Sequence, residues 1–403
     1  MKNKFLVVLL LAILSFAIIT GISNFIISNN NIEIIDNIVD NSDPVEEIVE
    51  EDIAEEAEEK PSSISIDLLA VGDVMFHTTQ IQSAQIGENE YDFNQAFKYV
   101  SSYIEEADIS MANFETVTVP DREYTGFPNF NSPVETIEAL SNAGFDILST
   151  ANNHSLDQGR DGIISTIDTI EENGMDYVGT SKEADSPPLI LDVEGMKIGF
   201  LSYTYGLNGM DVVITSDELS YMVNLIDERR VQDDIESLKE KDVDLIVSYI
   251  HWGNEYQMEP LEQQQVLGRN MIEWGVNILL GSHPHVLQRS EVVEFEGKSN
   301  YIVYSMGNFL SNQREITMGN SYTEDGVMIK INIEKDLESE ETIITNVDYI
   351  PTWVYRYGPE GNHSYEILPT EEVINGDLDI DVDDNVMERI EKSYNDVIGV
   401  YGE

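Results

Sequence analysis

The chain has no cysteine among its 403 residues. Disulfide bonds, thiolate metal ligands and cysteine nucleophiles are therefore excluded. Basic residues are scarce as well, because 21 Lys and Arg stand against 77 Asp and Glu and give a formal net charge of −56. Proteins bind nucleic acid through clustered Lys and Arg that displace counterions, and the sequence contains no such cluster. We therefore expect no nucleic-acid partner.

Hydrophobic residues make up 41% of the chain, which is enough for one large core or two ordinary ones. We therefore expect a folded, very acidic protein. The acidity has two interpretations. One is a solvated surface suited to salty surroundings, where ions shorten the range of self-repulsion. The other is a specific cation-binding role for the surface.

An apolar stretch at residues 5–27 follows Lys2 and Lys4. At ~1.5 Å per residue it is long enough to cross a hydrocarbon layer of ~30 Å. A cleaved signal peptide is the alternative, but the apolar stretch has no small-x-small cleavage site before the acidic linker that follows it. We predict an uncleaved single-pass anchor in the cell membrane, with the amino end in the cytoplasm and the C-terminal domain outside the cell.

Residues 28–62 are predicted to form an acidic disordered linker. Between Asn41 and Lys60 the chain has ten acidic residues, and Pro44 and Pro61 bracket this run. Because charges of one sign repel each other and extend the chain, we interpret the segment as a tether that lifts the domain off the membrane.

From Ser63 onward, short β-rich runs alternate with helical stretches, beginning with an expected strand at 66–71. The expected helices are 135–143, 162–173, 228–241 and 261–274, and they lead into apolar runs at 145–149, 176–178, 243–250 and 276–280. This alternation is typical of parallel strands joined by helical crossovers.

Three hairpins are also expected, at 189–193 with 197–203, 291–295 with 300–304, and 326–333 with 342–349. We therefore predict an α/β sheet with a second, more antiparallel sheet packed on it. The predicted domain covers residues 63–315, and a β-rich segment with an acidic tail at 316–403 completes it.

Most of the histidines follow expected strands and stand beside carboxylates or amides. There are six histidines in the chain, and the five in strand-end positions are His77, His154, His251, His283 and His285. Because the carboxyl ends of strands in an open α/β sheet face one crevice, we expect these side chains to converge.

Two early motifs offer oxygen ligands. Asp73 ends the first strand and is a ready ligand for a hard cation, although a Gly-Asp turn also commonly caps the following segment. Asn113 and Glu115 are two residues apart on an extended chain, so they project to the same side. Glu115 is expected to bridge two cations with support from Asn113, and the alternative is a hydrogen-bonded loop.

The segment 152–159 reads Asn-Asn-His-Ser-Leu-Asp-Gln-Gly. An Asn carbonyl of this run can bind a metal while His154 points at substrate. Asp157 orients His154 if the segment turns helical. The alternative is that Asp157 caps the following helix.

Three further histidines, His251, His283 and His285, lie in two motifs, which run from His251 to Tyr256 and from Gly281 to His285. Proline between His283 and His285 is expected to hold both rings on one side of an extended backbone, which suits one metal or two adjacent ones.

Together these residues predict a pocket of oxygen and nitrogen ligands for one or two divalent cations, with Mn, Zn, Mg and Fe as candidates. Two cations ~3.5 to 4 Å apart suit an in-line attack on phosphorus, because they lower the pKa of a bound water toward ~7 and neutralise the non-bridging oxygens. His154 is then expected to protonate the leaving oxygen.

The motifs resemble those of the CapA/PgsA family of poly-γ-glutamate capsule synthesis proteins. They occur in the family's order over about residues 66–313, and they are Gly72-Asp73, Asn113-Phe114-Glu115, the run 152–159, His251 to Tyr256, Gly281 to Gln288, and Ser305 to Phe309. That family is similar to the calcineurin-like metallophosphatases. The resemblance therefore implies a four-layer αββα sandwich, preceded here by the predicted transmembrane helix, with a two-metal site.

The resemblance also implies a distribution of ligands. One cation is assigned to Asp73, Glu115 and His285, and the other to Glu115, Asn153, His251 and His283. The catalytic pair is His154 with Asp157, and the supporting residues are His77, Asn113, Glu255 and Asn308. The first motif departs from the metallophosphatase pattern Asp-x-His, because Met75 stands at the His position and His77 is displaced by two. In the bridging position, Glu115 stands where the phosphatases use Asp.

Three functions of different class remain. The first is a membrane-anchored extracellular component of poly-γ-glutamate biosynthesis or export, with the membrane and other synthase subunits as partners. The second is a stand-alone cell-surface metal-dependent phosphoesterase or other hydrolase. The third is a non-catalytic scaffold with a vestigial site.

Overall fold

The computed structural model describes residues 62–359 and 361–402. The predicted anchor at 5–27 lies outside the described residues, as does nearly all of the predicted linker at 28–62. No helix within the described ranges is both long enough and apolar enough to span a membrane.

The first sheet has eight strands, in the order β16-β15-β14-β1-β4-β5-β6, with β13 also paired to β1. The strands β1, β4, β5 and β6 are parallel, whereas β14, β15 and β16 add to β1 as an antiparallel meander. Their bounds are β1 Ser63–Val74, β4 Ile109–Phe114, β5 Ile147–Ser149, β6 Asp176–Val178, β13 Asn308–Leu310, β14 Asp325–Asp336, β15 Thr342–Tyr357 and β16 Ser364–Pro369.

The second sheet has six strands, in the order β11-β12-β10-β9-β8-β7. Its four central strands are parallel, and the edge strands β7 and β11 pair antiparallel with their neighbours. The bounds are β7 Leu189–Val193, β8 Met196–Thr204, β9 Leu245–His251, β10 Ile278–Ser282, β11 Leu287–Phe295 and β12 Lys298–Met306. A short separate hairpin joins β2 (Gln85–Gly87) to β3 (Glu90–Tyr91).

Alternating side chains of β1 show how the layers are built. Leu68 and Ala70 point between the two sheets, where they pack with Val247 and Leu280 of the second sheet. Leu69 and Val71 point to the opposite face and pack under helices. The period of two along a strand therefore supplies two different cores from one segment.

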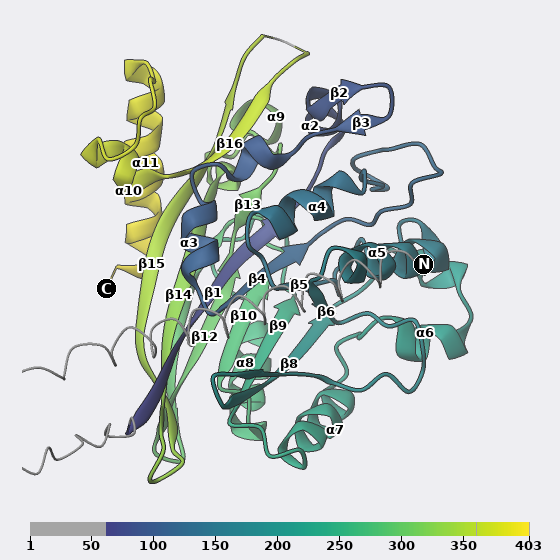
Figure 1. Ribbon diagram of the computed structural model, residues 1–403, viewed down its shortest axis with the longest axis vertical. Coiled ribbons are helices and arrows are strands. Elements are labelled where there is room, and N and C mark those ends of the chain that lie inside the picture. Colours follow the sequence, from purple (N-terminus) through teal and green to yellow (C-terminus); the bar gives the residue numbers. More distant parts are fainter. Residues whose placement is uncertain (1–61, 360, 403) are drawn as a thin grey trace, which may run out of the picture. The chain divides into compact units, whose positions relative to one another are not determined.

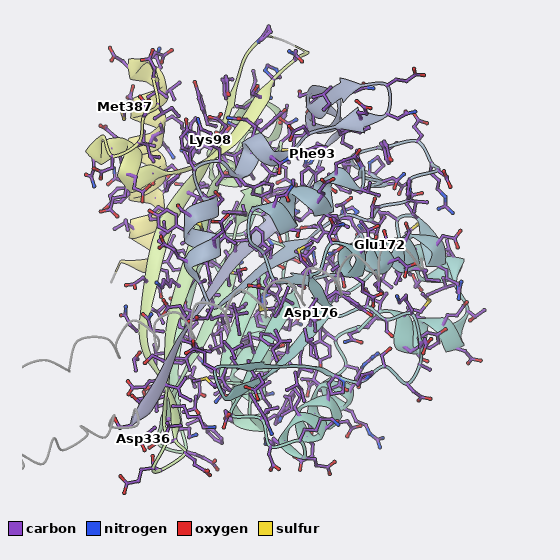
Figure 2. All side chains as sticks on the ribbon, viewed as in Figure 1. Phe93, Lys98, Glu172, Asp176, Asp336 and Met387 are labelled. Atoms are coloured by element: carbon purple, nitrogen blue, oxygen red, sulfur yellow. The ribbon has the colours of Figure 1, made fainter. Side chains whose placement is uncertain are left out.

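Helices cover both outer faces, so the order of layers is helices, sheet, sheet, helices (Figure 1). On the first sheet, Ile104, Ile137 and Leu140 pack from α3 and α4, and Phe93, labelled in Figure 2, packs edge-on against Phe76. The helices and turns before β8 are α2 Thr78–Ala84, η1 Asn94–Phe97, α3 Ser101–Glu106, α4 Glu135–Asn142 and α5 Gly159–Glu172.

On the second sheet the outer cover comes from α7 and α8, whose buried faces include Ile235 and Ile272. The remaining helices and turns are η2 Met210–Val213, α6 Ser216–Met222, α7 Glu228–Lys239, α8 Glu262–Trp274, α9 Glu315–Met318, η3 Ser321–Glu324, α10 Thr370–Asn375 and α11 Asp384–Tyr401. The four predicted helices therefore correspond to α4, α5, α7 and α8, with ends shifted by up to three residues.

All three predicted hairpins are present, but they do not form a separate antiparallel sheet. Each sheet instead has a parallel centre with antiparallel strands at one or both edges, so the expected division into one parallel and one more antiparallel sheet is wrong. The reason is local: the turns at 194–195 and 296–297 have positive φ at both residues, which brings the next strand back beside the last one. A hairpin therefore extends whichever sheet one of its two strands already belongs to.

The C-terminal segment ends in helices that the sequence interpretation described only as an acidic tail. In Figure 1, α10 and α11 lie beside β15. Residues of α11 contribute to two cores, with Ile390 packing near Trp353 and Val397 near the space between the sheets.

Candidate functional site

Six buried side chains converge where strands of both sheets end. Asp73 is the next-to-last residue of β1, Glu115 follows β4, His251 ends β9, and His283 and His285 follow β10. All five are 0 to 3% exposed, and Asn153, after β5, is 2% exposed. Two groups have ligand atoms within 4.8 Å of one another, namely Asp73, Glu115 and His285, and Glu115, His251 and His283.

Glu115 belongs to both groups, as expected for a residue that bridges two cations. Its Oε1 lies 3.6 Å from Nε2 of His251 and 3.8 Å from Nε2 of His285. This oxygen is buried and has no hydrogen-bond partner among the described residues. A buried carboxylate oxygen without a partner is costly, and a bound cation would remove that cost. The donor set therefore fits one or two divalent cations.

The electrostatics of the cluster agree with a cation site. Burial, with the nearby Asp73 charge, raises the pKa of Glu115 well above its ordinary value. Burial also lowers the pKa of His251 well below the usual range and that of His283 to about 3. Both imidazoles are therefore neutral at pH 7, which is the form that binds metal.

Amide and hydroxyl groups hold the ligands in place. Asn113 donates from Nδ2 to Oδ1 of Asp73 at 2.8 Å, and lies 3.3 Å from Nδ1 of His251. Nδ1 of His251 also lies 2.9 Å from Oγ of Ser282, which leaves Nε2 to face Glu115 and, at 3.0 Å, Oδ1 of Asn153. Such contacts fix the ring orientation that a metal ligand needs.

His285 is oriented by partners from two strands. Its Nδ1 lies 3.1 Å from both Oδ2 of Asp73 and Oδ1 of Asn308, so Nε2 points toward Glu115. Asn308 lies on β13, which pairs directly with β1 at Asp73. That pairing requires Gly72, since a Cβ there would meet the carbonyl oxygen of Gly307 at 2.0 Å.

The backbone of the His-Pro-His motif differs from the extended form that we expected. His283 has φ 96° and His285 has φ 57°, so both residues lie in the left-handed region rather than the extended one. The proline fixes only its own φ, and the turn around it is determined by contacts. One contact is the backbone N–H of His283, which donates to Oδ2 of Asp73 at 3.3 Å.

His154 sits beside the cluster and pairs with Asp157. Nδ1 of His154 lies 2.7 Å from Oδ2 of Asp157, and the same oxygen accepts a 2.7 Å hydrogen bond from the N–H of Phe130. Asp157 does not cap the next helix, because the residue at the start of α5 is Gln158. The segment therefore has the geometry in which Asp157 orients His154.

Two of the expected supporting residues have no hydrogen bond to the clustered side chains in the part of the chain that the structure describes. Glu255 is exposed on the loop after β9. His77 caps the start of α2, where Nδ1 lies 3.2 Å from Oε1 of Gln80 and its ring packs against Phe130. The structure thus brings Asn113 and Asn308 to the cluster, but within the described residues neither His77 nor Glu255 joins it.

Sequence reasoning missed several contributors. Ser282 contacts His251, and Asn152 donates from Nδ2 to the carbonyl oxygen of Phe114 at 2.8 Å. The ring centroid of Tyr205 lies 4.5 Å from that of His283, and the ring centroid of Tyr256 lies 6.1 Å from that of His285. Ser282 and Tyr256 lie in the histidine motifs, so their position in the sequence close to predicted ligands could have identified them. Tyr205 lies in no such motif, and nothing in the sequence points to it.

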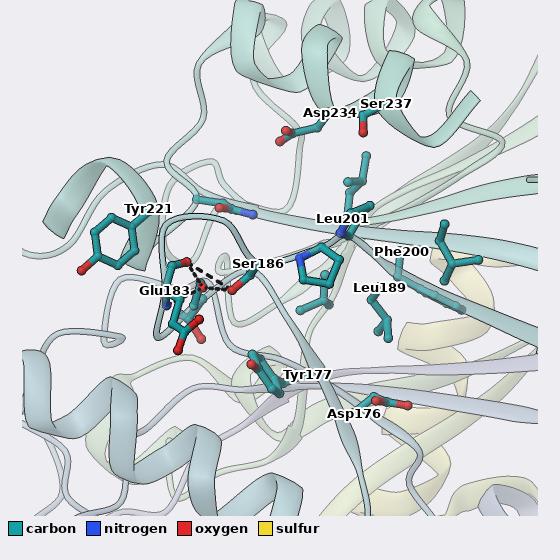
Figure 3. A pocket seen from close by; sticks show the side chains of 18 of the residues that line it. Asp176, Tyr177, Glu183, Ser186, Leu189, Phe200, Leu201, Tyr221, Asp234 and Ser237 are labelled. Carbon is teal, nitrogen blue, oxygen red and sulfur yellow. Dashed lines mark hydrogen bonds between the residues drawn. The ribbon is translucent and has the colours of Figure 1, made fainter. Parts of the chain in front are cut away.

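One cavity is separate from the histidine cluster. It has a volume of about 520 Å³ and lies between the edge strands β6 and β7, with Tyr177, Leu189 and Asp234 in its lining (Figure 3). None of the six clustered residues lines it.

Known proteins are similar in sequence to part of this chain. A family model described as "Bacterial capsule synthesis protein PGA_cap" matches residues 67–313. The "Capsule biosynthesis protein CapA" of Bacillus anthracis is 30% identical over 272 residues, which cover 65% of this chain and 62% of that protein. The "PGA biosynthesis protein CapA" of Bacillus subtilis (strain 168) is 27% identical over 252 residues, covering 60% and 61%. The matched region thus spans less than two thirds of these relatives.

Two solved structures with some likeness have a phosphatase or phosphoesterase in their titles. A "novel phosphatase" of Mycoplasma pneumoniae has a TM-score of 0.43 at 14% identity, covering 72% of this chain and 93% of that one. The "calcineurin-like phosphoesterase YfkN" of Bacillus subtilis has a TM-score of 0.42 at 12% identity, covering 84% and 99%. On the match to the family model, which takes in every residue of the buried cluster, the chain belongs to the PGA_cap family of bacterial capsule synthesis proteins.

Proposed function

We propose that this protein is a metal-dependent component of poly-γ-glutamate capsule biosynthesis or export, held at the membrane by residues 5–27 and acting outside the cell with other synthase subunits. Two relatives carry names that assign them to capsule or poly-γ-glutamate (PGA) biosynthesis. The observation that carries the metal dependence is the buried Oε1 of Glu115, which lies near Nε2 of both His251 and His285 and has no hydrogen-bond partner among the described residues.

The residues divide into binding and proton-transfer roles. Asp73, Glu115 and His285 would hold one cation, and Glu115, Asn153, His251 and His283 the other. Divalent cations at this position would activate water and neutralise charge on a phosphoryl or acyl oxygen. His154 holds a proton on the side of the pocket next to Asp157 and delivers it to a leaving oxygen.

Asp157 would fix the His154 ring during that transfer. Because Nδ1 of His154 faces the Asp157 carboxylate, Nε2 is the nitrogen left to meet a substrate. Asp157 is buried and also accepts from Phe130, so its orientation is fixed in turn. This pair favours hydrolysis over a purely structural metal site, and it supports the stand-alone phosphoesterase as the second candidate function.

Metal analysis of the full-length chain tests the site. Protein stripped with chelator and re-exposed to Mn²⁺, Zn²⁺, Mg²⁺ or Fe²⁺ is expected to take up one or two equivalents of at least one of them. His283→Ala with His285→Ala is expected to abolish uptake. Absence of stoichiometric uptake by the unaltered protein would contradict the proposal.

Complementation separates capsule function from general hydrolysis. In a strain that lacks its own capsule protein, we expect the unaltered chain to restore poly-γ-glutamate at the cell surface and the metal-free variant to fail. Hydrolysis of a phosphodiester without complementation would favour the stand-alone enzyme. Full complementation by the metal-free variant would favour the scaffold.

The membrane topology has its own test. Protease added to intact cells without a wall is expected to cut the linker and release a fragment of domain size. Protection of the chain from that protease would contradict an extracellular domain.

A further inference from the structure

An arginine near the candidate site stands out by its lack of an acidic partner. In residues 62–359 and 361–402 there are nine arginines, and eight of them lie within 4.0 Å of a carboxylate oxygen. The exception is Arg356, near the end of β15, which is half-buried. In a chain of net charge −56, a guanidinium without a carboxylate is the unusual case.

Arg356 is held by an amide rather than by an acid. Its Nη1 donates to Oδ1 of Asn312 at 3.3 Å, and the hydroxyl of Tyr365 donates to the same oxygen at 2.8 Å. By contrast, Arg314 nearby is neutralised by Glu324 at 2.9 Å. Arg356 is therefore positioned by neutral groups, and its charge remains available.

Asn312 connects Arg356 to the site. The backbone N–H of Asn312 donates to Nδ1 of His77 at 3.3 Å. The rings of His77 and His154 both pack against Phe130, at 5.5 Å and 4.7 Å.

The segment around Asn312 also contacts the cluster. Gln313, the next residue, accepts from Nδ2 of Asn308 at 3.2 Å and lies 3.5 Å from the hydroxyl of Tyr256. Arg356 and His77 thus both contact the segment that follows β13, and the next residue of that segment is bonded to Asn308 beside the cluster.

His77 presents a further donor there. Nδ1 faces the Asn312 N–H and Gln80, so Nε2 is the ring nitrogen left for a ligand. Burial lowers the pKa of His77 to about 4, so the ring is neutral at pH 7 and adds a hydrogen-bonding group rather than a second charge.

We propose that Arg356, with His77 beside it, binds an oxyanion of the substrate, either a phosphate or a carboxylate, while the proposed cation site holds the reacting group. This inference rests on the proposed function for the identity of the reacting group. The binding itself rests on charge: an anionic substrate is repelled by the acidic surface, and a guanidinium without a carboxylate partner supplies a local attraction with planar, directional donors.

Calorimetry on the full-length chain loaded with Mn²⁺ tests this inference. Inorganic phosphate and glutarate are titrated separately into the unaltered protein, Arg356→Gln, Arg356→Lys and the control Arg229→Gln. Gln keeps a donor for Asn312 but removes the charge, whereas Lys keeps the charge. Arg229 lies on α7 with a side chain 90% exposed, so it controls for the loss of one positive charge.

We expect Arg356→Gln to weaken binding of at least one anion by about 10- to 100-fold, in line with the loss of a hydrogen bond to a charged group. Arg356→Lys should retain most of the affinity, and Arg229→Gln should change it less than about twofold. Dependence of phosphate binding alone, or of glutarate binding alone, identifies the class of oxyanion.

Several results would overturn the inference. One is that Arg356→Gln binds both anions with affinities within twofold of the unaltered protein. Another is that the unaltered protein binds neither anion. The third is that the Gln and Lys variants lose affinity equally and both have a lower melting temperature. If the unaltered chain takes up no metal, the proposed function fails. The same titration without metal then still tests Arg356, because the guanidinium does not depend on the cations.

Discussion

His154 and the metal-binding candidates are all buried, yet their contacts differ. His154 faces Asp157, whereas His283 has a buried Nδ1 without a partner in the described residues. An unpartnered ring nitrogen beside carboxylates suits a ligand, and a ring fixed by an acid suits proton transfer. The two residues should therefore fail in different ways when they are replaced.

We predict that the His154→Ala variant still binds the cations, while its turnover of a phosphodiester is ~10² to 10⁴-fold lower than that of the unaltered protein. His283→Ala should lose the cation that His283 is proposed to hold, and turnover with it. Elemental analysis and hydrolysis of bis(4-nitrophenyl) phosphate on the same preparations check both expectations. Loss of metal from His154→Ala would show that this ring is a ligand instead.

His77 gives a prediction about pH. Its pKa is lowered from 6.5 to about 4, mainly by burial, so the folded state binds this proton less readily than the unfolded state. The stability contributed by neutral His77 is therefore complete above pH 6.5 and is lost as pH falls toward 4. The slope for one such group is at most about 1.4 kcal/mol per pH unit.

The measurement compares urea unfolding of the unaltered protein with that of His77→Gln between pH 4.5 and 7. Taking the difference between the two proteins removes the contributions of all other titrating groups. The unfolding free energy of the unaltered protein should exceed that of His77→Gln by a smaller amount as pH falls. A difference in unfolding free energy that stays constant over this range would contradict the depressed pKa.

At the scale of helices and strands, α11 connects the C-terminal segment to the site. Tyr401 donates from its hydroxyl to the carbonyl oxygen of Ser305 at 2.7 Å, and the hydroxyl of Ser305 donates to the carbonyl oxygen of Val286 at 2.8 Å. Val286 follows His285 directly. The end of α11 therefore supports the turn that carries two ligand candidates.

Removing the Tyr401 hydroxyl tests that support. Tyr401→Phe leaves a buried carbonyl without this donor, so we expect the unfolding free energy to fall by about 1–3 kcal/mol. Tyr394→Phe on the same helix is the matched control and should change it by less than about 0.5 kcal/mol. Equal effects of the two changes in urea unfolding would show that the contact contributes nothing.

Elements with a clear period could be predicted from the sequence. The apolar run of β1 and the helices before β5, β6, β9 and β10 follow from patterns of two and of three to four residues, and strand topology then places Asp73 and Glu115 at one edge. What could not be predicted depends on distant contacts. The left-handed φ of His283 and His285 follows from partners such as Asp73, and β13 is only three residues long.

The helix α11 was missed for a different reason. Its buried residues Ile390, Ser393, Val397 and Tyr401 recur every three or four positions, which is a helical period. They are few and stand among acidic residues, so composition suggested a tail. The spacing of these four residues indicates the helix, whereas the charge of the surrounding residues does not.

At the scale of the whole molecule, the dominant property is the net charge of −56. Like charges repel more strongly in the compact state than in the extended one, and salt screens them, since the Debye length falls from ~10 Å at 0.1 M to ~3 Å at 1 M. We therefore predict that the melting temperature at pH 7 rises as NaCl increases from 0.05 to 1 M.

A control at another pH and a comparison of cations separate screening from specific binding. Near pH 4.1, the isoelectric point of the sequence, net repulsion is small, so the salt effect should largely disappear. Because screening depends on ionic strength and not on the ion, NaCl and choline chloride should raise the melting temperature equally at pH 7. A flat or falling melting temperature in NaCl would contradict the prediction. An increase produced only by millimolar divalent cations, and retained after His283→Ala with His285→Ala removes the buried site, would instead mean that the acidic surface itself binds cations.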